Sequence, residues 1–266
     1  MPLLDKFRMD GQVAVITGAG KGIGAAIARA FAEVGSNVVI GARTEADLQA
    51  VAAEVSALGA KALVVPTDVL DFDQLQRLAD SAMAEFGRID ILVNNAGGSP
   101  PKPVSQTSSR EFEMALRFNV TTAFEMSRIC APLMVDSADG GNILNISSIA
   151  GHKPAPCFAA YGTAKGALSY LTRELAQEFA PRVRVNAIAV GSTRTDALNT
   201  VLTDEIEQTM VELTPMARLG EVEDIALGAL YLCSNAASYV TGDILCVNGG
   251  MERLNMQMPR AWGGSG

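Results

Sequence analysis

The chain has 266 residues, of which 48% are hydrophobic, and its formal net charge is −8. This composition supports one large core, and the acidic balance disfavours nucleic acid and anionic membranes as partners. No apolar run approaches the ~18 residues that span a bilayer, and the first residues lack the basic start and the long apolar stretch of a signal peptide. We therefore expect a single domain over residues 1–266, without a membrane segment.

The cysteines carry information about the compartment and about metals. Their spacing matches neither a metal site nor a disulfide framework. They are Cys130, Cys157, Cys233 and Cys246. We therefore expect a cytoplasmic protein without a bound metal.

Strand-like and helix-like segments alternate along the chain without a break. Short β-branched runs predict strands at Val13–Thr17, Asn37–Ile40, Ala62–Val65, Ile91–Asn94, Asn142–Ile146, Val183–Ala189 and Ile244–Val247. Apolar residues at helical spacing predict helices at Ile23–Glu33, Glu45–Leu58, Phe72–Phe86, Ser109–Met134, Ala160–Phe179 and Val222–Leu232. This order predicts an α/β fold of the Rossmann type, a doubly wound parallel sheet with helices on both faces. Ligands of such sheets bind at the carboxyl ends of the strands, where the strand order reverses.

A glycine-rich turn joins the first predicted strand to the first predicted helix. It reads Thr17-Gly18-Ala19-Gly20-Lys21-Gly22-Ile23-Gly24. Without side chains, its backbone N–H groups and the positive end of the helix can approach a pyrophosphate. A tight turn without a ligand needs one or two glycines rather than four. The turn therefore predicts a dinucleotide site.

Tyr161 and Lys165 lie four residues apart in a predicted helix, and Ser148 precedes the tyrosine by thirteen residues. Positions i and i+4 share a helix face, so the ammonium can reach the phenol. A free tyrosine has a pKa of about 10, and a nearby cation lowers it by stabilising the phenolate. This set is suited to general acid–base catalysis on an alcohol or a carbonyl.

Several motifs in a fixed order resemble those of the short-chain dehydrogenase/reductase family. They are the glycine turn, Asp68, Asn94-Asn95-Ala96-Gly97, Asn119, Ser148, Tyr161-x-x-x-Lys165 and Gly191. The chain departs from the family at Val190, where a proline is usual before the glycine. We expect the loop beside the nicotinamide to differ in shape there, while the catalytic residues are intact.

The resemblance implies that Asn119, Ser148, Tyr161 and Lys165 form the catalytic set. Tyr161 would exchange a proton with the substrate oxygen while hydride moves to or from a nicotinamide. Lys165 would lower the pKa of Tyr161 and bind the nicotinamide ribose, and Ser148 would orient and polarise the substrate oxygen. Ser147 is the competing hydroxyl, but the thirteen-residue spacing favours Ser148. Asn119 would hold a water in a proton relay to Lys165; taken alone, it is as well explained by an ordinary buried polar contact.

The same resemblance implies a set of cofactor contacts. They are Gly18, Lys21, Gly22, Ile23, Gly24, Arg43, Asp68, Val69, Asn95, Ala96, Gly97, Tyr161, Lys165, Gly191, Thr193 and Thr195. Where an acid would bind the 2′-hydroxyl of NAD, the chain has Ala42, and Arg43 follows. Lys21 adds a second cation. Each base alone would more often be a solvated surface charge; together they predict NADP(H) over NAD(H), because an arginine can bind a 2′-phosphate bidentately.

The segment 191–219 is the one long departure from the alternation. It is polar and partly helical, with Met210, Leu213 and Met216 expected on an apolar side. We interpret it as a lid over the substrate, the alternative being a surface insertion. The tail, 251–266, includes Trp262 and is expected to rest on a neighbouring subunit, since relatives are commonly tetramers.

Short substrate-side stretches resemble the bacterial 7α-hydroxysteroid dehydrogenases within the family. They include Gly97-Gly98-x-x-Pro101-Lys102-Pro103 and Thr195-Asp196-Ala197-Leu198. The expected partner is therefore a small-molecule alcohol or ketone, and a hydroxysteroid in particular.

Two other functions stay open. One is a reductase of 3-oxoacyl-acyl carrier proteins or small ketones. The acidic stretch 134–139 disfavours carrier-bound substrates, which need a basic docking face. The other is a non-catalytic NADP-binding redox sensor, a minor alternative because relatives of that kind typically lack the tyrosine or the lysine.

Overall fold

A computed structural model describes residues 2–200 and 202–258, and within them seven parallel strands form one sheet. The strands are β1 (Val13–Thr17), β2 (Asn37–Ala42), β3 (Ala62–Pro66), β4 (Ile91–Asn94), β5 (Gly141–Ser148), β6 (Val183–Val190) and β7 (Ile244–Val247). Their order across the sheet is β3-β2-β1-β4-β5-β6-β7. The predicted doubly wound parallel sheet is confirmed, and each strand end lies within two residues of its predicted position.

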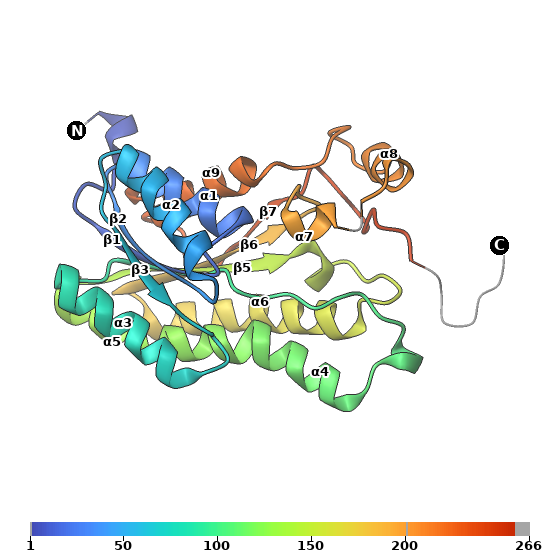
Figure 1. Cartoon of the computed structure of the whole chain (residues 1–266), viewed down its shortest axis with the longest axis horizontal. Helices are drawn as coiled ribbons and strands as arrows, with labels where there is room; N and C mark the ends of the chain where they lie inside the picture. The colour runs from blue at the N-terminus through green and yellow to red at the C-terminus, as the bar shows by residue number, and fades with distance from the viewer. Residues whose placement is uncertain (1, 201, 259–266) are drawn as a thin grey trace.

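Helices cover both faces of the sheet (Figure 1). They are α1 (Gly22–Glu33), α2 (Glu45–Ala57), α3 (Phe72–Phe86), α4 (Ser109–Leu116), α5 (Thr122–Ala138), α6 (Ala159–Phe179), α7 (Asp196–Asn199), α8 (Asp204–Glu212) and α9 (Val222–Cys233). Helices α1, α2 and α9 pack on one face around Ile16 and Phe31, and α3, α5 and α6 pack on the other around Val15 and Leu75. Val15 and Ile16 are neighbours in β1, so successive side chains of this strand enter opposite cores. In the part of the chain that the structure describes, no helix is long and apolar enough to cross a membrane.

One predicted helix is interrupted by a wider turn. The sequence predicted a single helix over Ser109–Met134, whereas α4 and α5 are joined by a π-helical turn at Arg117–Thr121. Such turns are frequent at functional sites, because the extra residue re-aims a side chain. Here the turn buries Asn119, which is 2% exposed. The helix also continues to Ala138, so most of the stretch 134–139 is a last helical turn rather than a connection.

The order of the strands reverses between β1 and β4. Just after β4, the side-chain amide of Asn95 donates to the carbonyl oxygens of Thr17 (3.0 Å) and Gly18 (2.9 Å). The hydroxyl of Thr17 accepts from the backbone N–H groups of Asn95 (3.1 Å) and Ala96 (3.2 Å). The ends of β1 and β4 are thereby fixed together at the position where a doubly wound sheet binds its ligand.

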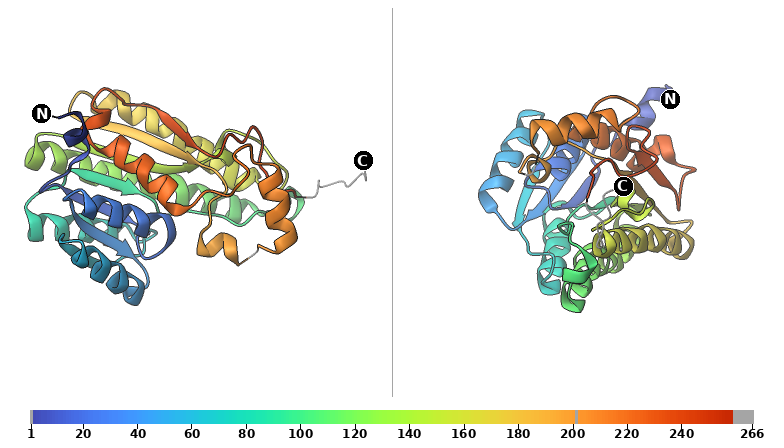
Figure 2. Two further views of the ribbon diagram at one scale, coloured as in Figure 1. Left: turned by 90° about the horizontal axis from the view of Figure 1, so that it is seen from above. Right: turned by 90° about the vertical axis from the view of Figure 1, so that its right-hand side faces the viewer.

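The segment 191–219 contains α7 and α8, which lie at one end of the molecule, beyond the carboxyl ends of the strands (Figures 1 and 2). Met210 faces inward and is 1% exposed, but Met216 is 64% exposed. The expectation for Met216 is therefore wrong. Helix α8 ends at Glu212, so Met216 lies beyond the helix on which the expectation was based.

Residues 251–258 of the tail fold back onto their own chain. Met251 and Asn255 are buried, at 4% and 1% exposed. This part of the tail packs against its own chain, and the expected contact with a neighbouring subunit stays a prediction. Trp262, which was also assigned to the tail, lies outside the described residues.

Candidate functional site

The glycine turn approaches β4 too closely for side chains at two positions. A Cβ on Gly18 would lie 2.9 Å from Nδ2 of Asn95, and a Cβ on Gly24 would lie 2.5 Å from the carbonyl oxygen of Gly18. Helix α1 begins at Gly22, and its N-cap residue, Lys21, makes no capping hydrogen bond with its side chain. The first N–H groups of α1 and its dipole are thus available to an anion. The turn fits the pyrophosphate of a dinucleotide.

Two cavities flank this turn along the carboxyl edge of the sheet. The first, of about 410 Å³, lies on the side of β2, and the second, of about 380 Å³, lies between α1 and α6. The predicted residues that line the first are Gly18, Lys21, Arg43, Asp68, Val69, Asn95, Ala96 and Gly97. Those that line the second are Lys21, Gly22, Ile23, Asn95, Gly97, Ser148, Tyr161, Lys165, Gly191 and Thr195. Since three residues line both cavities, together they form one elongated site of the kind a dinucleotide needs.

Three predicted residues do not line these cavities. Gly24 packs beneath the turn, as its contact with Gly18 requires. Thr193 is buried and lines a different cavity, and its hydroxyl donates to the carbonyl of Gly191 at 3.3 Å. Asn119 lies behind the loop that follows β4.

The first cavity carries charge of both signs. Arg43 is exposed at its edge, next to Ala42. Lys21 Nζ lies 3.3 Å from Oδ1 of Asp47, a carboxylate that the sequence analysis missed. Asp47 stands in the first turn of α2, where acids are common for helix stability alone, so no local signal distinguished it. Lys21 is therefore partly neutralised, and within the described residues Arg43 forms no ion pair.

Helix α6 carries Tyr161 and Lys165 close to the end of β5. A Cβ on Gly151 would lie 2.6 Å from the carbonyl carbon of Lys165, and a Cβ on Gly162 would lie 2.8 Å from the carbonyl oxygen of Ala150. The absence of these side chains lets α6 contact the turn after β5. The two predicted catalytic side chains therefore reach the floor of the second cavity.

The ammonium of Lys165 lies beside the ring of Tyr161. Its Nζ is 5.8 Å from the ring centre and donates to the carbonyl of Ile146 at 2.7 Å. Ser148, at the end of β5, is hydrogen-bonded to Tyr161. The hydroxyl of Ser147 bonds the carbonyl of Lys165 at 3.0 Å, and it is therefore held against α6.

Burial is the largest influence on the pKa values of Tyr161 and Lys165. It raises the pKa of Tyr161 above its ordinary value, while the hydrogen bond with Ser148 acts in the opposite direction. Burial also lowers the pKa of Lys165 to about 8. The sequence led us to expect that Lys165 lowers the pKa of Tyr161. In this structure the loss of hydration at the base of the second cavity is the largest effect on the phenol, and the hydrogen bond with Ser148 is the one that opposes it.

Asn119 fixes the loop after β4. Its Oδ1 accepts from the backbone N–H of Gly98 at 2.8 Å, and its Nδ2 donates to the carbonyls of Gly98 (3.0 Å) and Ala115 (2.9 Å). A Cβ on Gly97 would lie 2.6 Å from Asn119 Oδ1 and 3.0 Å from Lys165 Nζ. Gly97 thus separates the two side chains. The arrangement places Asn119 near Lys165, and its role in a proton relay stays a prediction.

A third cavity, of about 960 Å³, opens from the same tyrosine. It shares Gly98 and Tyr161 with the second cavity. Its lining is mostly apolar and comes from the loop after β4, the start of α6, the segment 191–219 and the tail. Among the described residues that line it, Glu205 is the one acid and no base is present. Phe158 and Met256 were missed by the sequence analysis, because only the folded chain brings them to Tyr161.

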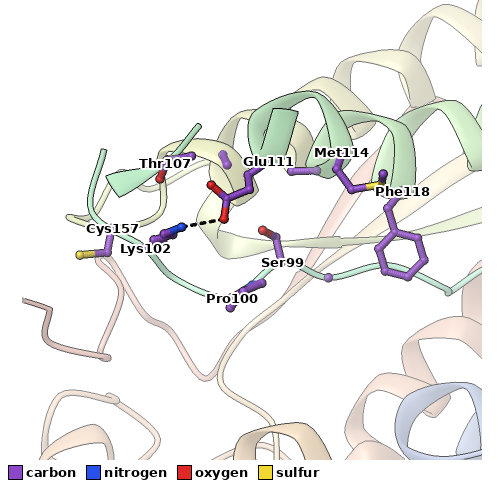
Figure 3. A pocket seen from close by; sticks show the side chains of 11 residues that line it. Ser99, Pro100, Lys102, Thr107, Glu111, Met114, Phe118 and Cys157 are labelled. Carbon is purple, nitrogen blue, oxygen red and sulfur yellow. Dashed lines mark hydrogen bonds and ion pairs between the residues drawn. The ribbon is translucent and has the colours of Figure 1, made fainter. Parts of the chain in front are cut away.

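A fourth cavity, of about 360 Å³, lies beside the third (Figure 3). Gly98, Ser99 and Pro100 line both, so this loop is a partition between them. Lys102 points toward Glu111 of α4 in Figure 3, with Nζ 2.6 Å from Oε1. The backbone N–H of Lys102 donates to the carbonyl of Cys157 at 2.8 Å. The partition is thus tied to α4 and to the segment that leads into α6.

Comparisons of the sequence and of the structure with known proteins point to the same family and to the same fold. A family model described as enoyl-(acyl carrier protein) reductase matches residues 18–252. The chain is 46% identical to an uncharacterised oxidoreductase of Mycobacterium tuberculosis over 97% of this chain and 98% of that protein. It is 43% identical to the 7α-hydroxysteroid dehydrogenase of Escherichia coli K12 over 94% of this chain and 98% of that protein.

Two solved structures match closely. One is a 7α-hydroxysteroid dehydrogenase in complex with NADH and 7-oxo glycochenodeoxycholic acid. It is 43% identical, with a TM-score of 0.90 over 93% of this chain and 96% of that chain. The other is a short-chain type dehydrogenase/reductase from Mycobacterium marinum. It is 36% identical, with a TM-score of 0.89 over 94% of this chain and 99% of that chain.

The lowered pKa of Lys165 predicts that this residue costs stability. Its pKa is about 8 in the folded protein, against an ordinary value of 10.5, which corresponds to a cost of roughly 3 kcal/mol at neutral pH. We expect Lys165→Met to raise the free energy of unfolding at pH 7, by less than this amount because the bond to Ile146 is lost.

The difference in stability between Lys165→Met and the wild type should depend on pH in a definite direction. Between pH 8 and 10.5 the unfolded wild type binds more protons than the folded one, so wild-type stability rises with pH in that window. The advantage of the variant should therefore shrink between pH 7 and pH 10. Urea denaturation at both pH values measures this, with Lys61→Met, an exposed lysine, as the control. A variant that is less stable at pH 7 would contradict the prediction.

Proposed function

The chain belongs to the short-chain dehydrogenase/reductase family, and from this premise we propose that it is an NADP(H)-dependent enzyme that interconverts a secondary alcohol and a ketone. One observation carries the proposal. Tyr161 lines both the second cavity, which belongs to the dinucleotide-shaped site, and the large apolar cavity. A group that exchanges protons with a substrate must contact both spaces, because hydride and proton leave neighbouring atoms of the same substrate.

The residues of the chain account for the proton transfer and the orientation. When bound, the nicotinamide accepts or supplies the hydride. In the oxidation direction the phenolic oxygen of Tyr161 takes the proton of the substrate hydroxyl, and the Ser148 hydroxyl holds the substrate oxygen. The ammonium of Lys165, 5.8 Å from the ring centre, stabilises the phenolate that precedes this step. Asn119 positions the loop at Gly98 and is proposed to hold a water on the path from Lys165 to solvent.

The preference for NADP(H) rests on the first cavity. Ala42 supplies no carboxylate for a 2′-hydroxyl, and among the described residues that line this cavity Arg43 is the cation without an ion pair, since Lys21 pairs with Asp47. A guanidinium can bind a 2′-phosphate through two parallel hydrogen bonds. The similar 7α-hydroxysteroid dehydrogenase structure contains NADH, so the cofactor is the feature in which we expect this chain to differ from it.

A hydroxysteroid is the proposed substrate class. The third cavity is large and mostly apolar, and Met210, Met256 and Met258 can adapt to a rigid ring system. The 43% identity to a 7α-hydroxysteroid dehydrogenase covers nearly the whole chain. The ketone or alcohol would meet Tyr161 at the inner end of the cavity.

A reductase of 3-oxoacyl thioesters or small ketones is the second candidate. The description of the matching family model names an acyl carrier protein. The sequence disfavoured a carrier-bound substrate because the stretch 134–139 is acidic. The structure weakens this argument, because the stretch precedes β5 and so lies at the amino edge of the sheet. The cavities open at the opposite edge.

A non-catalytic redox sensor is the third candidate. It would need the cofactor site but not the large cavity joined to it at Tyr161. The continuity of the two spaces favours the enzyme.

We also propose that the chain forms a homotetramer in the cytoplasm, binding neither nucleic acid nor membrane. Strand β7 is an edge of the sheet, and large apolar side chains near it are exposed: Leu227 of α9 at 63% and Tyr239 fully. Exposed apolar surface beside an open strand edge is typical of subunit contacts.

Cell fractionation with an antibody tests the proposed cytoplasmic location, and recovery of the protein in the membrane pellet would contradict it.

Replacing Tyr161 with phenylalanine should abolish most turnover and leave cofactor binding intact. The assay is NADP⁺ reduction with a 7α-hydroxylated bile acid, followed by nicotinamide absorbance. Loss of the proton carrier is expected to reduce kcat by about 10²–10⁴-fold, with the Kd for NADPH unchanged. Tyr170→Phe, an exposed tyrosine on the same helix, is the matched control.

The outcomes separate the candidate functions. Equal turnover in wild type and Tyr161→Phe would refute the assigned role of the phenol. A wild type that binds NADPH but is inactive on steroids, small ketones and acyl thioesters would instead favour the sensor.

Arg43→Ala should weaken NADPH binding specifically. Loss of a charge-assisted hydrogen-bond pair is expected to raise the Kd for NADPH about 10- to 100-fold, with little effect on NADH. Titration of nicotinamide fluorescence measures both constants. Arg77→Ala, an exposed arginine on α3, serves as the control. If the wild type binds NADH as tightly as NADPH, the proposed preference is wrong.

Light scattering on the purified chain should give four times the mass of one chain. Leu227→Glu places a charge in the proposed contact and should yield a smaller assembly. A monomeric wild type would refute the tetramer.

A further inference from the structure

A polar side chain in the tail is buried more deeply than its neighbours. Asn255 is 1% exposed, whereas Glu252 and Arg253 in the same segment are exposed. Burying a primary amide costs free energy unless its donors and acceptor are all satisfied. The segment around it has no regular secondary structure. The partners of Asn255 therefore explain why this part of the chain takes one position.

Asn255 uses its whole side-chain amide in bonds to two other segments. Its Oδ1 accepts from the hydroxyl of Ser192 at 2.5 Å. Its Nδ2 donates to the carbonyl of Met210 at 3.1 Å and to the hydroxyl of Thr214 at 2.9 Å. No other residue type of this size offers two donors and an acceptor from one planar group. Asp would lose the donors, and Leu would lose all three bonds.

The tail and the two segments that Asn255 bonds surround the site described above. Ser192 follows Gly191, which lines the second cavity. Met210 belongs to α8 and lines the large cavity, as does Met256, the next residue after Asn255. A single amide therefore connects the loop beside the second cavity, helix α8 and the last described residues of the tail.

We propose that Asn255 is a positioning residue that determines substrate size and shape. It holds Met256–Met258 as a wall of the large cavity, and it fixes the distance of that wall from α8 and from the loop at Ser192. The inference rests on the proposed function, since it takes the large cavity as the substrate site. A rigid four-ring substrate reaches this wall, whereas a small secondary alcohol contacts only Ser148, Tyr161 and their surroundings. Loss of the bonds should consequently affect the large substrate alone.

The test compares Asn255→Leu with Arg253→Ala. Leucine has the same branched arrangement of heavy atoms without the three bonds, and Arg253 is an exposed residue in the same segment. For each variant, kcat and KM are measured with NADP⁺ for a hydroxysteroid and for cyclohexanol. In Asn255→Leu the KM for the hydroxysteroid should rise about tenfold or more, with kcat/KM for cyclohexanol and the Kd for NADPH within about twofold of wild type. Arg253→Ala should behave as wild type throughout.

Two results would overturn the inference. One is a hydroxysteroid KM unchanged in Asn255→Leu. The other is an equal loss for both substrates, which would show a general structural role.

Hydrogen exchange gives a second readout that needs no substrate. In Asn255→Leu, exchange should increase in α8 and in residues 251–258 but not in α6; an unchanged pattern would refute the positioning role. A wild type that oxidises neither substrate would refute the proposed hydroxysteroid substrate, and the exchange experiment would still decide whether Asn255 holds the wall.

Discussion

The hydrogen bonds between Asn95 and the end of β1 join the two strands between which the strand order reverses, and the arrangement of the rest of the structure depends on this junction. Strand order runs outward from β1 and β4 in opposite directions, so the helices that follow these two strands leave toward opposite faces of the sheet. A crevice results between them, and the side chain of Asn95 closes its floor by bonding Thr17 and Gly18 at 2.9–3.0 Å. The glycines of the turn follow from this closeness, because Gly18 and Gly24 have no room for a Cβ.

The same crevice explains why the chemical groups are buried at a cost. Lys165 lies on a helix that contacts the turn after β5 through Gly151 and Gly162, and its ammonium meets a carbonyl, that of Ile146, rather than a carboxylate. A carboxylate partner would neutralise the charge and keep the pKa high. A carbonyl leaves the charge available to a neighbouring phenolate, and burial brings the pKa to about 8. Under the proposed function, the chain loses stability at the position where the buried ammonium would assist proton transfer.

The local sequence was enough to predict the structural features that are determined by residues close together in the chain. The strands, the glycine turn and the shared face of Tyr161 and Lys165 follow from periods of 2 and 3.6 residues. The π-helical turn at Arg117–Thr121 does not, because its residues form an ordinary helical pattern and the deviation is set by the bonds of Asn119 to Gly98. Met216 was misplaced for the related reason that a helix end, rather than its periodicity, decided its exposure.

Contacts between distant segments were the other part that sequence could not provide. Asp47 meets Lys21 across 26 positions, and Asn255 meets Ser192, Met210 and Thr214 across 41 to 63 positions. Neither residue belongs to a motif, and each is an ordinary polar residue in its local context. Only the folded chain shows that one changes the charge at the first cavity and that the other joins three segments.

The walls of the large cavity are held in a different way from the proposed catalytic group. Tyr161, Lys165 and Ser148 stand on α6 and β5, whose positions are fixed by the sheet and its cores. The cavity walls are loops and short helices, each held by a few polar bonds: Lys102 with Glu111 for the partition, Arg194 with Glu207 for α8, and Asn255 for the tail. A polar bond at a loop can be exchanged without disturbing a core, so the reaction can stay constant while the accepted substrate changes. Under the proposed function, the specificity of this chain therefore depends on residues outside the predicted catalytic motif, among them those that fix loops to one another.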